Sequence, residues 1–133
     1  MSPRNGRERM ASAQDLPPQE ALQTLGSELL AIHEESYGRS AAKVSVHAAD
    51  DAVVVFLDGI DFHPSERFLI DNGQGETVLR TRAAYQEAIQ TTFEAAVERA
   101  TGRRVVSFTS ATKLDPPWSV EVFRLAPAES PRV

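Results

Sequence analysis

The chain has 133 residues, of which 41% are apolar and 25% charged, and its formal net charge is −5. This acidic balance does not favour sequence-independent nucleic-acid binding or adsorption to an anionic membrane surface, because both need a surplus of Lys and Arg. The absence of cysteine excludes disulfides, thiolate catalysis and cysteine-ligated zinc.

The N-terminal part predicts a tail followed by a helix. Residues 1–18 are polar and lack hydrophobic periodicity, so we expect them to be disordered. Pro17-Pro18 suits the first turn of a helix, and Gly38 suits the C-cap after Tyr37. Apolar residues recur between these ends at spacings of three and four: Leu22, Leu25, Leu29 and Ile32.

A β-hairpin is expected next. Residues 43–48 alternate between apolar and polar side chains, which is typical of a half-exposed strand. Asp50-Asp51 predicts a tight turn, and residues 52–58, which are apolar up to Leu57, predict a second strand that ends at Asp58-Gly59.

Both sides of that second strand are apolar. Its alternating residues are Val54 and Phe56 on one side and Val53, Val55 and Leu57 on the other. Two helices cover only one face of a sheet, and an apolar second face favours cover as well. We therefore expect a homodimer joined through this second face or an adjacent edge.

Two helices follow. Residues 62–70 predict a short helix opened by Pro64, and residues 71–75 predict a flexible turn. A long amphipathic helix then runs over residues 78–100 and ends at Gly102. Its apolar positions are Val78, Tyr85, Ile89, Phe93, Val97 and Ala100.

Two more strands, residues 104–110 and 119–125, complete the pattern, joined by a loop with Asp115-Pro116-Pro117. The order helix, hairpin, short helix, long helix, hairpin predicts an α+β two-layer sandwich. Its antiparallel sheet, of about four strands in two hairpins, packs on two main helices. We expect one domain over residues 19–125 and tails at residues 1–18 and 126–133.

The hydrophobic pattern also bears on location. The longest purely apolar run, residues 52–57, is far shorter than the ~20 residues that span a bilayer. No hydrophobic segment follows the N-terminal arginines, so a secretory signal is not expected. We expect a cytoplasmic protein without direct membrane insertion, and any tie to a membrane would run through a partner protein.

No catalytic grouping emerges from the sequence. The histidines, His33, His47 and His63, lack the spacing of a zinc site, so neither a metal nor a cofactor is expected. Gly73 and Gly75 precede a helix, where glycines can cradle a phosphate. However, they follow a helix rather than a strand and no Lys accompanies them, so a hinge is the favoured interpretation.

Three other side chains are candidates for binding or for an interface. Arg82 and Glu66 would line a small pocket beside Gly73 and Gly75, although an ion pair that joins two helices is the simpler account. Trp118 follows two prolines, and it is expected either to plug the base of the last hairpin or to be presented at an interface.

Several short motifs taken together resemble the MpsC-like family, a small bacterial domain named for a sodium-translocating, membrane-potential-generating system. They are Gly38-Arg39, Asp58-Gly59, Phe62-His63-Pro64-Ser65-Glu66, Arg82, Gly102-Arg103, Asp115 and the closing residues 120–125. The resemblance covers about residues 20–125. It implies an accessory or regulatory part in bacterial ion homeostasis, and it implies no reaction.

Two positions depart from the family pattern. Ser40-Ala41 stands where the family tends to show Gly-Pro. His63 stands where the family favours the Thr of a capping box, while Glu66 is kept. We therefore expect the short helix to be capped less well, by something on the order of 1 kcal/mol.

Three hypotheses about function remain open. The leading one is a non-enzymatic homodimer that serves as an accessory or regulatory partner of a membrane system. The second is a sensor of small molecules or anions built on Arg82 and Glu66. The third, an enzyme with Glu66 and His63 as acid and base, is disfavoured because no third group is placed to orient them.

Overall fold

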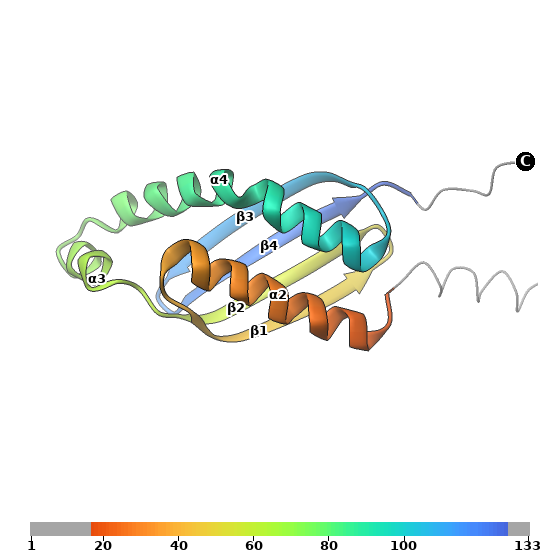
Figure 1. Ribbon diagram of the computed structural model, residues 1–133. Coiled ribbons are helices and arrows are strands. Elements are labelled where there is room, and N and C mark those ends of the chain that lie inside the picture. Colours follow the sequence, from red (N-terminus) through yellow and green to blue (C-terminus); the bar gives the residue numbers. More distant parts are fainter. Residues whose placement is uncertain (1–16, 128–133) are drawn as a thin grey trace, which may run out of the picture.

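The computed structural model describes residues 17–127. Its elements, in chain order, are α2 (Gln19–Tyr37), β1 (Ala41–Ala49), β2 (Ala52–Ile60), α3 (Pro64–Asp71), α4 (Gly75–Thr101), β3 (Val105–Leu114) and β4 (Pro117–Leu125). The strands form one antiparallel sheet in the order β1-β2-β4-β3. Helices α2 and α4 lie side by side over one face of this sheet (Figure 1). The α+β two-layer sandwich predicted from the sequence is therefore confirmed, with its element order.

The core lies between the two helices and the central strands. Val53, Val55 and Leu57 of β2 are fully buried on the helix-facing side, together with Phe123 of β4. On the helices, Leu25, Leu29, Phe93 and Val97 pack against them. Both helices end on a left-handed glycine, Gly38 after α2 and Gly102 after α4, as the sequence predicted.

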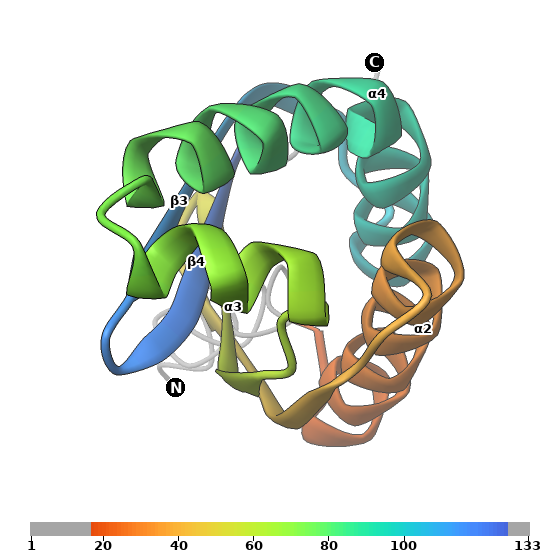
Figure 2. The same cartoon turned by 90° about the vertical axis from the view of Figure 1, so that its left-hand side faces the viewer.

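Helix α3 lies beyond the end of the sheet, at the front of Figure 2. A second, smaller core of Ile60, Phe62 and Val78 forms there, with Leu69 and Ile70 of α3 packed against it. The carboxylate of Glu66 accepts a hydrogen bond from the backbone N–H of His63 at 2.8 Å, which is one half of a capping box. The ring Nε2 of His63 lies 2.5 Å from the carbonyl oxygen of Tyr37 and so links α3 to the end of α2.

The strands are longer than the sequence pattern indicated. Strand β2 continues through Asp58-Gly59 to Ile60, and β3 extends to Leu114 rather than ending at Ser110. The expected loop shrinks to Asp115-Pro116, because Leu114 and Pro117 already form the last pair of the hairpin. As a result, Trp118 is the second residue of β4, close to the hairpin turn, where it pairs with Lys113.

The long helix also differs in one position from its predicted apolar stripe. Tyr85 is 44% exposed, whereas the polar residues Arg82 and Gln86 are buried on the inner side of α4. The Tyr85 ring packs on that of Tyr37 with ring centres 4.8 Å apart, so it covers a polar region of the interior from outside.

Two further sequence expectations concern the membrane and the tails. No helix within residues 17–127 has the length and apolar character needed to cross a bilayer. Of the two predicted tails, residues 1–16 and 128–133 lie outside the described part of the chain.

Candidate functional site

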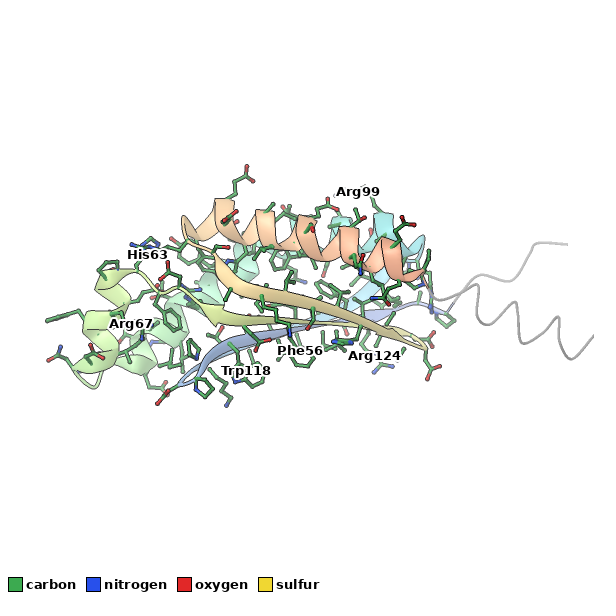
Figure 3. The ribbon with its side chains drawn as sticks, turned by 90° about the horizontal axis from the view of Figure 1, so that it is seen from below. Phe56, His63, Arg67, Arg99, Trp118 and Arg124 are labelled. Carbon is green, nitrogen blue, oxygen red and sulfur yellow. The ribbon has the colours of Figure 1, made fainter. Side chains whose placement is uncertain are left out.

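The face of the sheet that points away from the helices, here called the open face, has an apolar centre. Val54 and Phe56 of β2 stand beside Val122 and Val120 of β4 in the strand register. Figure 3 shows Phe56 and Trp118 projecting from the side of the sheet opposite to Arg99, which belongs to α4. The rings of Phe56 and Trp118 lie 6.1 Å apart, and these apolar residues are only half-buried.

Charged residues surround this centre. Lys43, Asp58 and Lys113 stand in register around Trp118, and Arg124 lies near the other end of β4. Within residues 17–127, no helix covers the open face (Figure 3). An apolar centre with a charged rim is the composition of a protein–protein interface.

Arg82 and Glu66, which the sequence placed together, meet in the structure. The guanidinium Nε and Nη2 of Arg82 donate to the two carboxylate oxygens of Glu66 at 2.8 and 2.9 Å. The same guanidinium lies over the rings of Tyr37, at 4.3 Å from the ring centre, and Phe62, at 4.7 Å. Only 2% of Arg82 is exposed. The four residues Arg82, Glu66, Tyr37 and Phe62 are called the Arg82 cluster.

The geometry of the Arg82 cluster favours a structural role. Burial alone would raise the pKa of the Glu66 carboxyl, but the hydrogen bonds from Arg82 and from the His63 backbone, with the Arg82 charge, hold it below its ordinary value. The ion pair joins α3 to α4, and the stacked Tyr37 adds α2. A bidentate, ring-stacked guanidinium has little remaining capacity for an external anion.

The other candidates lie apart from this cluster. Gly73 has a positive φ of 76° in the turn between α3 and α4. Gly75 begins α4, and a Cβ there would lie 2.7 Å from the end of the Leu114 side chain of β3. Trp118 lies on the open face. The structure therefore joins Arg82 to Glu66, and assigns Gly73, Gly75 and Trp118 to other places.

A second polar group, which the sequence did not indicate, lies between α4 and the sheet. Gln86 donates from its side-chain amide to the Tyr37 hydroxyl at 2.9 Å. Ser110 of β3 stands directly across from Glu121 of β4, and the Ser119 hydroxyl donates to Glu121 at 3.2 Å. These five residues are called the interior polar cluster.

Glu121 is the most unusual member of the interior polar cluster, because none of its surface is exposed. Burial raises the pKa of the Glu121 carboxyl to about 7, against which the hydroxyls of Ser110 and Ser119 act weakly. Burial likewise raises the pKa of Tyr37 to about 12, and the charge of Glu121 contributes to that shift. Tyr37 and Glu121 are thus electrostatic neighbours, and Gln86 is hydrogen-bonded to Tyr37.

The sequence contains only an indirect signal for Glu121. A Glu between valines in an alternating strand is usually taken to face solvent. However, Glu121 shares its face with Phe123 and Ser119 because side chains alternate along β4, and Phe123 belongs to the core. Assigning Phe123 to the interior would therefore have placed Glu121 there too.

The histidines are dispersed. His33 is buried, and burial together with the charge of Arg82 lowers its pKa to about 4. His47 packs its ring against Phe56 on the open face, and His63 bonds to the carbonyl of Tyr37. Across residues 17–127, no three His, Asp or Glu residues gather where they could together hold a metal ion.

Comparison with known protein families identifies a match for this chain. The model of a family described as Na+-translocating membrane potential-generating system (MpsC) matches residues 19–127. No curated protein and no solved structure matches the chain significantly.

Proposed function

The chain belongs to the MpsC family, and from this premise we propose that it is a non-enzymatic accessory or regulatory component of a cation-translocating, membrane-potential-generating system. Its own helices in the described part cannot span a bilayer, so its contribution would be made through contact with other proteins. The proposal places the chain in the cytoplasm, beside a membrane-protein partner.

The open face is the observation that carries this proposal. Its centre combines two large aromatic side chains with β-branched residues, and aromatic side chains are enriched in the buried centre of interfaces. Leaving a face of this composition in water is unfavourable in free energy, and covering it is favourable. We propose that a second copy of the chain covers it, giving a homodimer.

A two-fold arrangement suits the open face. An isologous dimer uses the same patch on both copies, so one apolar centre meets another around the axis. The Trp118 end of the rim carries Asp58 together with Lys43 and Lys113, and Arg124 lies towards the other end. In an antiparallel face-to-face arrangement, Asp58 of one copy can pair with Arg124 of the other.

The oligomeric state tests the dimer directly. Light scattering coupled to gel filtration should report a dimer for the natural chain at high micromolar concentration. Phe56→Glu should shift it to a monomer, because the substitution places a charge in the apolar centre. Phe68→Glu is the matched control, since Phe68 is 66% exposed on α3 and lies outside the open face. A strict monomer for the natural chain would contradict the dimer.

The accessory role needs a second experiment. A tagged chain should recover membrane proteins from cells that express the membrane system, and Phe56→Glu should show whether recovery needs the open face. Recovery of soluble proteins alone would count against the role, while leaving the dimer intact.

Sensing of a small molecule or anion is the second candidate function. Its expected site at Arg82 and Glu66 is occupied by their mutual bonds and stacked rings. A thermal-shift screen with anions and nucleotides decides the matter, since a ligand of the folded state raises the melting temperature.

A further inference from the structure

A small cavity opens between α4 and β3, on the side of the molecule away from α2. Its volume is about 130 Å³, and its walls are formed by Leu79, Ala83, Gln86, Ser110 and Thr112. Since one water molecule in the liquid takes about 30 Å³, the cavity has room for a few waters or a small hydrated ion.

Two members of the interior polar cluster, Gln86 and Ser110, belong to the walls of this cavity. Gln86 is 6% exposed and Ser110 is half-buried, and both line the cavity. Glu121 stands directly across the strand pair from Ser110. Within residues 17–127, three buried oxygens of these residues have no hydrogen-bond partner: Gln86 Oε1, Ser110 Oγ and Glu121 Oε1. Buried polar atoms in proteins almost always have partners, so such a group points to a ligand.

We propose that Gln86, Ser110 and Glu121 form a binding site for a small monovalent cation, which enters through the cavity between α4 and β3. All three ligands are oxygens, and oxygen ligands are preferred by hard cations. The cation contacts are completed by water from the cavity.

Charge balance selects a monovalent ion. Glu121 interacts with Ser110 of β3, Ser119 of β4 and Tyr37 of α2, and Gln86 of α4 hydrogen-bonds to Tyr37. None of these groups is charged near neutral pH. One buried carboxylate neutralises one positive charge, whereas a divalent ion would leave a net charge in a low-dielectric interior. Arg82, which is buried on α4, is already paired with Glu66.

A competing account holds that Glu121 is simply a neutral acid. The pKa of Glu121, raised by burial to about 7, allows either a proton or a cation to neutralise it near neutral pH. At pH 8 the carboxylate of Glu121 predominates over the neutral acid, so a cation effect is most readily measured at that pH.

Thermal unfolding in matched salts tests the proposal. The full chain would be unfolded at pH 8 in NaCl, KCl and choline chloride at equal ionic strength, so that screening is the same in each. We expect NaCl or KCl to raise the melting temperature by about 3 °C or more over choline, with a saturable dependence on concentration. Equal melting temperatures in all three salts would overturn the site.

Three variants test whether the proposed residues cause the rise in melting temperature in NaCl or KCl. Ser110→Ala removes one proposed oxygen ligand and changes little volume, so the chain should fold and show a smaller cation shift. Glu121→Gln removes the charge and should abolish the shift. Glu87→Gln is the control, because Glu87 is exposed on the same helix and should keep the natural response. A full shift in both Ser110→Ala and Glu121→Gln would also overturn the site.

The cation site is independent of the proposed dimer. Phe56→Glu acts on the opposite face of the sheet, so its monomer should retain the shift seen in NaCl or KCl. Broadening of the sodium NMR signal by the natural chain, relieved by Glu121→Gln, gives a direct reading of binding.

Discussion

Arg82 donates two hydrogen bonds, of 2.8 and 2.9 Å, to the carboxylate of Glu66, and the Tyr37 and Phe62 rings lie against the same guanidinium. One buried side chain therefore connects α2, α3, α4 and the segment that follows β2. Arg is suited to this position because its planar group can bond at its edge and stack on both faces at the same time.

Removing Arg82 should be costly. Arg82→Ala leaves the partly buried Glu66 without its partner and removes the packing of the guanidinium on the Tyr37 and Phe62 rings. The free energy of unfolding should therefore fall by roughly 3–5 kcal/mol. The matched control is Arg39→Ala, which breaks the exposed ion pair with Asp61 and should cost at most about 1 kcal/mol. Urea unfolding followed by circular dichroism gives both values, and losses of equal size would contradict the structural role of the Arg82 cluster.

Replacing Glu121 should change how stability depends on pH. Between its ordinary pKa of 4.5 and the folded value of about 7, the folded chain keeps a proton that the unfolded chain has released. Raising the pH through this window therefore lowers the free energy of unfolding of the natural chain. The Gln of Glu121→Gln does not titrate. The free energy of unfolding of this variant, relative to that of the natural chain, should therefore rise by something on the order of 3 kcal/mol from pH 4.5 to pH 7. Parallel stability curves would contradict the buried carboxyl.

His33 should act in the opposite direction. Its pKa falls from 6.5 in the unfolded chain to about 4, so the unfolded chain takes up a proton first as the pH is lowered. The natural chain should lose stability from pH 6.5 down to pH 4, and His33→Phe should lose less over that range, with a difference on the order of 3 kcal/mol. The same urea series checks this, and a variant that follows the natural chain would contradict it.

Arg103 should stabilise the far end of the sheet. It donates to the carbonyl oxygens of Asp50 and Ala126 and pairs with the Asp51 carboxylate, which joins the first hairpin turn to the chain after β4. Arg103→Ala should lower the free energy of unfolding by roughly 2–3 kcal/mol and speed amide exchange at the turn. Arg104→Ala is the control, because Arg104 is exposed and its loss should stay within about 0.5 kcal/mol.

Local sequence patterns predicted most of the fold because each element carries its own signal. Glycines marked both helix ends, and strict alternation identified β1 and the inner side of β2. The strand order β1-β2-β4-β3 has no such signal, since it depends on how the last hairpin docks beside β2 after the long helix. The pairing of β2 with β4 joins segments far apart in the chain.

The polar interior was predictable only in part. Arg82 and Glu66 were linked through their positions beside the turn between the two helices and their opposite charges, and the structure contains that ion pair. Gln86 and Glu121 escaped notice because hydrophobic periodicity assigns polar residues to the outside. Tyr85 was misplaced for the same reason, since Arg82 and Gln86 occupy the inner positions that an apolar count would give to it.

Trp118 is the single tryptophan of the sequence, and it lies beside Phe56 on the open face. The strongest intrinsic fluorophore of the protein therefore lies on the surface where contact with another subunit is proposed. Its emission moves to shorter wavelength when water leaves its surroundings, so assembly can be followed in unlabelled protein, at concentrations too low for scattering.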